Sequence, residues 1–279
     1  MGQSVMRIGA STAIYWNYKE HDLPAAMKHM CDMGFSCVEI LCEHPFYTNW
    51  ATEDAEKEKE SIKELLDSYE LDVSVHAPYH DLNIASLNPG IRSETVRQLR
   101  EAIEVASDLN AEVLVVHPGF VASRKYPRSM AHAIMVDTLI DIADYAGGAD
   151  VVIGLENIAN KPKALAVHAT ELVRTVADVG SKNLRVTFDV AHANTIGTPL
   201  IDFVDTLGKL IKHVHVSDNK GFDDHLPIGV GNIDYRAVLS KLIENGYKGL
   251  LIIEGWIPSD PDQFVKLSKD KLKDMLKGL

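Results

Sequence analysis

Cysteine and aromatic residues are scarce in this sequence, and long hydrophobic runs are missing. The 279 residues contain 7% aromatic residues and three cysteines, Cys31, Cys37 and Cys42, with no Cys-x-x-Cys pair. This usage is typical of a reduced cytoplasmic protein rather than a disulfide-stabilised secreted one. No stretch reaches the ~18 consecutive apolar residues of a membrane span, and the first residues lack the basic-then-apolar pattern of a secretory signal. We therefore expect a cytoplasmic protein without membrane contact.

Positive charge is also in short supply. Lys and Arg total 28 against 40 Asp and Glu, which gives a net charge of −12. An acidic surface is a poor platform for the many phosphate contacts that drive nucleic-acid affinity, so DNA is a less favoured partner. The proportions of 46% hydrophobic and 24% charged residues are those of a globular protein and exclude disorder, collagen-like repeats and coiled coil.

Short runs rich in β-formers recur along the chain at intervals that leave room for a helix between them. Eight such runs are predicted as strands: Arg7–Thr12, Cys37–Leu41, Asp72–His76, Glu112–His117, Val151–Glu156, Arg185–Asp189, Lys212–Ser217 and Leu250–Glu254. Eight strands alternating with helices, without a linker or low-complexity tract, predict an α/β protein that forms a single (β/α)8 barrel over residues 1–279. The alternative is an open doubly wound sheet, although no Gly-x-Gly-x-x-Gly follows the first strand.

Three of the intervening segments have a helical pattern. In Ser129–Gly147 the apolar residues share one face, Ser129 is expected to cap the start, and Gly147 is expected to end the helix. Asp234–Gly246 has the same plan, with Asp234 as the cap and Gly246 as the terminator. Ala51–Tyr69 is predicted as a charged, mostly solvated helix.

Metal-capable side chains end each of the last six predicted strands. The carboxyl ends of barrel strands meet at one rim, where catalytic sites are built. The residues are His76, His117, Glu156, Asp189 with His192, His215 and Glu254, and the loop after the seventh strand adds Asp223 and His225. A lone His or Glu at a strand end is usually structural, and His213, one layer deeper than His215, is interpreted that way. Several like charges buried together would be costly without cations, so the convergence predicts a divalent-metal site. Mixed His and carboxylate ligands suit Zn²⁺, Mn²⁺, Fe²⁺ or Co²⁺ better than Ca²⁺.

The chain from Arg7 to Glu254 resembles the xylose isomerase-like TIM-barrel superfamily, which includes sugar isomerases, epimerases and the endonuclease IV family. The resemblance is carried by Gly-Leu-Glu-Asn, Phe-Asp-Val-Ala-His-Ala-Asn, His-Val-His-Val-Ser-Asp-Asn and Asp-His-Leu-Pro-Ile-Gly-Val-Gly-Asn-Ile-Asp. It implies that Glu156, Asp189, His215 and Glu254 hold one divalent metal and that the two glutamates transfer protons. The endonuclease branch holds three zinc ions with nine ligands, and its other five positions correspond to His76, His117, His192, Asp223 and His225, which are all present.

Three departures from the endonuclease pattern favour the isomerase branch. Asn83 lies seven residues after His76 rather than six, Asp189-Val-Ala-His192 replaces Asp-Thr-Cys-His, and Asp223 follows His215 by only eight residues. The segment Glu43–Glu60 is also acidic where a DNA-facing loop would be basic.

The favoured hypothesis is a metal-dependent isomerase or epimerase of a sugar or sugar phosphate that works by proton transfer through an enediolate, with one to three Mn, Zn or Co ions. Glu156, Glu254 and His192 are the candidate catalytic residues, with His192 orienting a substrate hydroxyl. Trp16 and Trp256 are candidates for lining the sugar.

The alternative is a zinc-dependent AP endonuclease of the endonuclease IV type, in which five basic residues would contact DNA phosphates: Arg124, Lys125, Arg128, Lys161 and Lys163. A homodimer is possible in either case.

Overall fold

A closed parallel barrel is the central feature of the computed structural model of this chain, which describes residues 6–43, 53–256 and 258–279. The barrel strands are β1 (Arg7–Ser11), β2 (Cys37–Leu41), β3 (Asp72–His76), β4 (Leu114–Val116), β5 (Ile153–Glu156), β6 (Leu184–Asp189), β7 (Ile211–Val216) and β8 (Leu250–Ile253). Each strand pairs with its sequence neighbours, and β8 pairs with β1 to close the ring. The predicted fold class, an α/β protein built as a single (β/α)8 barrel, is confirmed.

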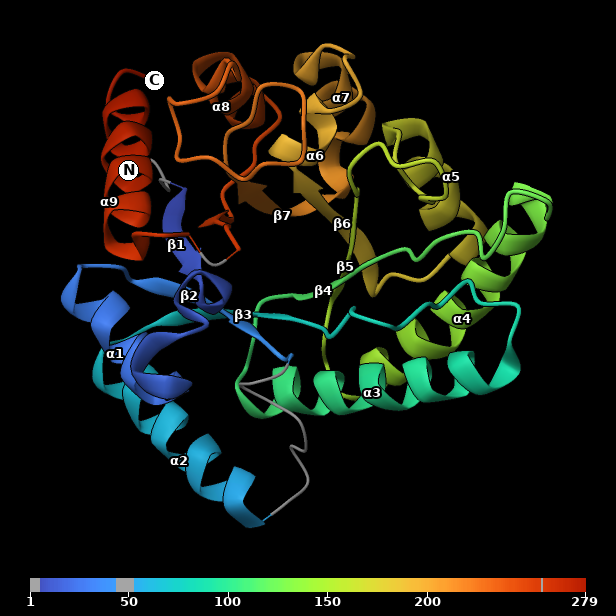
Figure 1. Cartoon of the computed structure of the whole chain (residues 1–279), viewed down its shortest axis with the longest axis horizontal. Helices are drawn as coiled ribbons and strands as arrows, with labels where there is room; N and C mark the ends of the chain where they lie inside the picture. The colour runs from blue at the N-terminus through green and yellow to red at the C-terminus, as the bar shows by residue number, and fades with distance from the viewer. Residues whose placement is uncertain (1–5, 44–52, 257) are drawn as a thin grey trace.

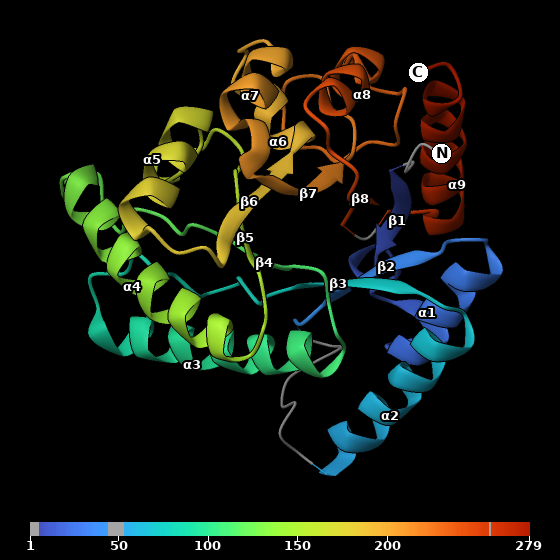
Figure 2. The ribbon, with the colours of Figure 1, turned by 180° about the vertical axis from the view of Figure 1, so that it is seen from behind.

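Helices surround the strands, as Figure 1 and the reverse view in Figure 2 show. Those in the described residues are α1 (Leu23–Asp32), α2 (Glu53–Ser68), α3 (Pro89–Asp108), α4 (Arg128–Gly148), α5 (Ala169–Val179), α6 (Val190–Asn194), α7 (Leu200–Leu207), α8 (Tyr235–Glu244) and α9 (Pro261–Leu276). Short 3-10 turns lie at Thr12–Tyr15, Tyr18–Glu20 and Gly208–Leu210. The main apolar core lies between the strands and this outer layer.

The predicted strands lie where the structure has them, with small differences at their ends. β2 and β3 have the predicted bounds, whereas the strand predicted over Glu112–His117 is reduced to β4. His117 precedes Pro118, which has no N–H with which to continue the ladder. The last strand ends one residue before Glu254, so this side chain stands just beyond β8.

The expected boundaries of one helix are wrong. Ser129 does not cap α4, which starts at Arg128 directly after Pro127, and Gly147 does not end it, because the helix continues through Gly148. The buried apolar face of α4 extends to Ala146, and the ~1 kcal/mol cost of a helical glycine is too small to stop a packed helix.

The other two predicted helices agree better with the structure. Asp234 caps α8 by accepting from the Ala237 N–H at 3.1 Å, and Gly246 follows the helix with a φ of +79°. The helix expected over Ala51–Tyr69 is α2, although residues 51 and 52 lie outside the described residues. Half of the acidic segment Glu43–Glu60 that precedes and enters it, residues 44–52, lies outside as well.

The barrel interior is filled in layers that support the rim. Gly154 faces inward on β5, where a Cβ atom would lie 2.3 Å from Thr187 Oγ1 and 2.9 Å from Val113 Cγ1. Deeper in the barrel, Cys37, Leu250 and Ile252 form a small apolar cluster of their own. The inward placement of Gly154 and Ile252 agrees with the alternation expected from the sequence.

None of the helices in the described part of the chain is long and apolar enough to cross a membrane. All three cysteines are free and buried. The cytoplasmic location and the extent of one domain over residues 1–279 stay predictions.

Candidate metal centre

Four side chains meet at the carboxyl end of the barrel. Glu156 ends β5, Asp189 ends β6, His215 lies on β7, and Glu254 follows β8. One ligand atom from each lies within 4.8 Å of the others. The side chains of Glu156, Asp189 and His215 are fully buried, while that of Glu254 is 17% exposed. The group therefore has a closed floor and opens toward solvent on the Glu254 side.

Asp189 is fixed in place by its neighbours along the chain and across the barrel. It caps the short helix α6 through a 2.5 Å bond from the His192 N–H to its Oδ1. Asn157, the fully buried residue after Glu156, donates through Nδ2 to the Asp189 carbonyl at 2.8 Å and accepts from the Asp189 N–H at 2.9 Å. These contacts leave Asp189 Oδ2 directed at the centre of the group. Asn157 ends the Gly-Leu-Glu-Asn motif, and its contacts to the Asp189 backbone were not expected from the sequence.

The charges of this group are only partly balanced by the protein. Burial raises the pKa of Asp189 to about 7, and the negative charges of Glu254 and Glu156 add to that rise. Burial acts in the same direction on Glu156, but His215 and His117 hold the pKa of its carboxyl well below the usual value. Burial opposes the charged form of His215 as well, yet the surrounding carboxylates raise its pKa well above the usual value. Carboxylates that are buried this close together normally need a cation to balance their negative charge.

Four buried polar atoms at this rim have no hydrogen-bond partner among the described residues: His76 Nε2, Glu156 Oε2, Asp189 Oδ2 and Glu254 Oε2. Buried polar atoms are nearly always paired, and three of these four can only accept. Acceptors that face one another in a dry site are what a divalent cation coordinates. The residues present therefore fit a metal ion, with His and carboxylate ligands that suit Zn²⁺, Mn²⁺ or Co²⁺.

A second group shares Glu156 with the first. His76 Nε2 lies 3.4 Å and His117 Nε2 lies 3.1 Å from Glu156 Oε2. The Nδ1 atom of His76 donates to the Ala77 carbonyl at 2.8 Å, which directs Nε2 at the carboxylate of Glu156. The ring of Tyr79 stacks on His117 with 4.3 Å between centroids and covers its outer face.

The third group lies nearer the surface and consists of His192, Asp223 and His225. Asp223 Oδ1 lies 3.5 Å from His192 Nε2 and 3.4 Å from His225 Nε2. The other ring nitrogens are held by Asn157, whose carbonyl is 3.0 Å from His192 Nδ1, and by Ser217, whose Oγ is 3.1 Å from His225 Nδ1. Metal-ligating histidines are usually oriented in this way through their second nitrogen.

The structure thus brings all nine predicted ligand residues to one rim, in three groups. Whether each binds a metal stays a prediction. His192 lies between the first and third groups, with Nδ1 3.4 Å from Glu156 Oε1. Its predicted role in orienting a substrate hydroxyl is compatible with this place and likewise stays a prediction.

Glu39 is the main site residue that was missed from the sequence. It lies in the middle of β2, is fully buried, and its Oε2 is 3.1 Å from His215 Nε2 and 2.9 Å from His213 Nε2. Ser74 on β3 donates to the same oxygen at 3.0 Å. The signal that could have found it is a single acidic residue inside the apolar run Cys37-Val-Glu-Ile-Leu41. His213, interpreted as structural from the sequence, contacts Glu39 beneath the four-residue group, and that interpretation stays a prediction.

Aromatic rings border the opening of the centre. Trp16 and Trp256 lie 6.3 Å apart between ring centroids, and His80 lies 5.3 Å from Trp256 and 4.3 Å from Tyr79. This row leads from the rim to His117 over the second group. The two tryptophans are therefore placed where the sequence analysis expected an apolar wall for a sugar.

The basic residues considered for DNA contact are spread over the rim and do not form one patch of unpaired charge. Lys161 Nζ lies 2.7 Å from Asp223 Oδ2, so it reaches the third group. Arg128 pairs with Glu171, and Lys163 donates to the Ala122 carbonyl at 3.1 Å. Arg124 and Lys125 are exposed.

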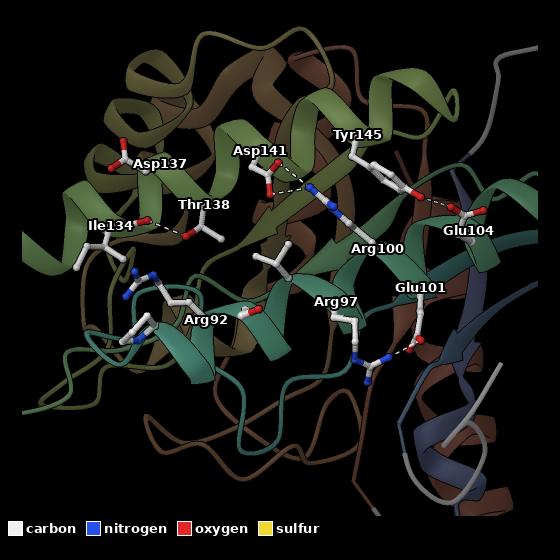
Figure 3. A pocket seen from close by; sticks show the side chains of 13 residues that line it. Arg92, Arg97, Arg100, Glu101, Glu104, Ile134, Asp137, Thr138, Asp141 and Tyr145 are labelled. Carbon is white, nitrogen blue, oxygen red and sulfur yellow. Dashed lines mark hydrogen bonds and ion pairs between the residues drawn. The ribbon is translucent and has the colours of Figure 1, made fainter. Parts of the chain in front are cut away.

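A separate hollow of about 700 Å³ lies on the outside of the barrel between α3 and α4 (Figure 3). Its charges pair with one another: Arg100 binds Asp141 at 2.8 Å and 3.0 Å, Arg97 pairs with Glu101, and Tyr145 donates to Glu104. None of the nine metal-capable residues lines it. This hollow is therefore not part of the candidate metal centre.

Relatives of this chain come from both branches considered above. A protein of Methanocaldococcus jannaschii, MJ1311, is 38% identical over 258 residues, covering 89% of this chain and 83% of that protein. Fructoselysine 3-epimerase of Shigella flexneri is 22% identical over 236 residues, covering 82% and 83%. Probable endonuclease 4 of Mycobacterium leprae is 30% identical over 222 residues, covering 75% and 81%.

Solved structures share the whole architecture. A D-tagatose 3-epimerase-like protein superposes with a TM-score of 0.85 at 38% identity, covering 98% of this chain and 97% of that one. An L-ribulose 3-epimerase superposes with a TM-score of 0.83 at 20% identity, covering 98% and 95%, which shows the fold alone. The family model described as xylose isomerase-like TIM barrel matches residues 28–275. The chain therefore belongs to the xylose isomerase-like TIM-barrel family.

Proposed function

We propose that this protein is a divalent-metal-dependent isomerase or epimerase of a sugar or sugar phosphate. The observation that carries the proposal is the group Glu156, Asp189, His215 and Glu254, whose ligand atoms lie within 4.8 Å of one another at the carboxyl end of the barrel. The names of three similar proteins support the substrate class: the D-tagatose 3-epimerase-like protein, the fructoselysine 3-epimerase and the L-ribulose 3-epimerase.

A bound Mn²⁺, Zn²⁺ or Co²⁺ ion would polarise a substrate carbonyl and so make the neighbouring carbon-bound proton more acidic. Glu156, Asp189, His215 and Glu254 would hold this ion. Glu156 and Glu254 each have two carboxylate oxygens, so one oxygen can bind the metal while the other takes a proton from carbon. One of them removes the proton and the other returns it, and the substrate passes through an enediolate between the two transfers.

The surrounding residues orient the substrate and limit access of water. Glu254 lies on the more open side of the site, whereas Glu156 is fully buried, so a sugar enters past Glu254 and meets Glu156 at the floor. Trp16 and Trp256 offer apolar surface at the entrance, and His192 is placed to donate to or accept from a hydroxyl.

Exchange of a substrate proton with solvent tests this proposal. Metal-loaded protein incubated in D₂O with a panel of ketohexoses, ketopentoses and their phosphates is expected to place deuterium at the carbon next to the carbonyl, detected by NMR or mass spectrometry. Glu254→Gln is expected to bind metal yet to lose this exchange. Glu244→Gln, a change on the exposed end of α8, is the matched control and should exchange normally. Exchange retained in Glu254→Gln would remove Glu254 from the proton-transfer role.

An AP endonuclease of the endonuclease IV type is the second candidate, and it rests on one specific observation. All nine residues of the predicted three-metal site lie in the three groups described above, and the endonuclease relative is 30% identical. Clustered zinc ions would supply hydroxide and neutralise a phosphodiester. Chelator-sensitive cleavage of a duplex with one abasic site would support this candidate, and an intact duplex at high protein concentration would reject it.

The predicted homodimer is tested separately by light scattering.

A further inference from the structure

A buried carboxylate lies directly beneath the candidate metal centre and belongs to none of the predicted ligands. We propose that Glu39 is a positioning residue that orients the His215 ring so that its Nδ1 atom faces Glu156, Asp189 and Glu254, and that this contact sets the affinity of the centre for its metal. The inference rests on the proposed function, because it assigns His215 as a metal ligand.

Both ring nitrogens of His215 face carboxylates, one on each side of the ring. Nε2 lies 3.1 Å from Glu39 Oε2 alone. Nδ1 lies 3.2 Å from Glu156 Oε1, 3.4 Å from Glu254 Oε2 and 4.0 Å from Asp189 Oδ2. Because a carboxylate only accepts hydrogen bonds, Nε2 carries a proton toward Glu39. On the other side, a metal held by the three carboxylates would take the place of the proton on Nδ1.

Glu39 reaches His215 across the barrel interior. β2 and β7 are not paired strands, and β1 and β8 lie between them in the closed ring. Ser74 on the adjacent strand β3 and His213 on β7 also donate to Oε2, at 3.0 Å and 2.9 Å. Three donors therefore converge on one oxygen of a side chain that is fully buried. Such a carboxylate is held in one place, so it can hold His215 in one orientation.

A simple cross-barrel ion pair is the competing interpretation of the same contacts. In that case Glu39 would stabilise the fold without a specific effect on metal binding. The difference is measurable, because carboxylates that orient a metal-ligating histidine typically change metal affinity by 10- to 100-fold when they are altered. Glu39, His213 and His215 could also hold a cation themselves, and their ligand atoms do lie within 4.8 Å of one another. A metal there would bind Nε2 rather than Nδ1 of His215.

The test compares the full-length wild-type protein with Glu39→Gln and with the control Thr175→Val. Apo proteins are titrated with Mn²⁺ and with Zn²⁺ by isothermal calorimetry, and their folding is checked by thermal unfolding in the presence of chelator. Glu39→Gln keeps the size of the side chain but removes its charge, and we expect its dissociation constant to rise 10- to 100-fold. Thr175→Val alters a fully buried polar side chain on the outer helix α5, which donates to the Glu171 carbonyl and touches neither Glu39 nor His215, so its dissociation constant should stay within about threefold of wild type.

A second readout reports on the two ring nitrogens of His215 directly. Wild-type protein labelled with ¹⁵N-histidine and loaded with ¹¹³Cd²⁺ should show a histidine whose Nε2 carries a proton and whose Nδ1 is coupled to cadmium, and this signal should be absent in His215→Asn. In Glu39→Gln, if it folds, we expect faster exchange of the Nε2 proton with water. These results would show an effect on the ring of His215 that a purely structural role would not produce.

Several outcomes would overturn the proposal. One is an unchanged metal affinity in folded Glu39→Gln. Another is an equal loss in Thr175→Val, which would indicate a general effect of altering buried polar groups. A third is coupling of cadmium to Nε2 of His215. If the wild-type protein bound no divalent metal, the proposed function would fail together with this inference, whereas the other three outcomes would leave the metal-dependent function intact.

Discussion

Raising the pH of the metal-free protein should destabilise it, and a divalent cation should restore the loss. Three fully buried groups of the candidate centre take part. Burial raises the pKa of Asp189 to about 7. Burial lowers the pKa values of His215 and His192, but nearby carboxylates raise them more strongly. Both pKa values are therefore well above the usual value of 6.5. In each case the folded chain binds a proton more tightly than the unfolded chain does.

The direction of the effect follows from this difference. The stability that His192 and His215 contribute is present below about pH 6.5 and is lost as the pH rises through their folded-state pKa values. The raised pKa of Asp189 acts the same way up to about pH 7, because ionising it in the buried site becomes steadily more costly. The lowered pKa values of Glu156 and Glu254 matter only in acid, since both are ionised throughout this range.

The size of the effect comes from the same three groups. One pKa unit corresponds to about 1.4 kcal/mol, so the rise of the Asp189 pKa from 3.8 to about 7 alone gives a loss on the order of 4 kcal/mol that is complete by about pH 7, and the two histidines add a further loss above pH 6.5. For a chain of this size that is a fall of roughly 5–15 °C in Tm. A divalent cation replaces the protons, so the loaded protein should be much less sensitive to pH. A cation at 100 times its dissociation constant adds about 2.7 kcal/mol.

Differential scanning calorimetry of chelator-treated protein, with and without Mn²⁺ or Zn²⁺, measures this directly. Asp189→Asn should flatten the pH profile of the metal-free protein. Asp178→Asn, which alters an exposed carboxylate paired with His132, should leave the profile unchanged. A metal-free wild-type protein whose Tm does not fall toward high pH, or an Asp189→Asn profile as steep as that of wild type, would refute the reasoning.

Three further predictions concern the support of the centre. Gly154→Ala places a Cβ 2.3 Å from Thr187 Oγ1, so it should lower the free energy of unfolding by about 1–3 kcal/mol and weaken metal binding. The new Cβ of Gly148→Ala meets nothing within 4 Å, so this change should raise the free energy of unfolding by up to about 1 kcal/mol. Chemical denaturation distinguishes the two variants, and equal effects would contradict the packing. Asp218→Ala removes the carboxylate that accepts from the N–H groups of Asn219, Gly229 and Ile233. We expect the free energy of unfolding, measured in urea, to fall by about 3 kcal/mol and the loop that carries Asp223 and His225 to be released. A fall below about 1 kcal/mol would contradict this role. Lys161→Met removes the cationic partner of Asp223. A second or third metal ion should then bind about two- to fivefold more tightly in calorimetric titration. Weaker binding would show that Lys161 does not compete with the metal for Asp223.

Much of this site could be predicted because the barrel has a simple geometry. Parallel strands direct their carboxyl ends to one rim, so His76, Glu156 and Asp189 could be expected to converge although more than 100 residues separate the first from the last. Inward and outward faces alternate along each strand, so Gly154 lies beneath Glu156 on the inward face of β5. Neither inference needs the details of side-chain packing.

Contacts across the barrel could not be read in the same way. Glu39 and His215 are 176 residues apart and lie on strands that do not pair, so nothing local connects them. Asn157 likewise acts through the backbone of Asp189, and the contact depends on the exact height of β5 beside β6. The end of α4 was misplaced for a related reason, since packing of its apolar face against the barrel outweighs the local signal of Gly147.

The central claim is that Glu156, Asp189, His215 and Glu254 form a metal centre, and metal content tests it most directly. Elemental mass spectrometry of untagged protein, purified without added metal or chelator, should give at least one Mn, Co or Zn per chain. Asp189→Asn, if folded, should lose that ion. A content near one would identify this group as the working site, and two or three zinc ions would bring His76, His117, Asp223 and His225 into use. Wild-type protein with no divalent metal that also takes up none on titration would contradict the account.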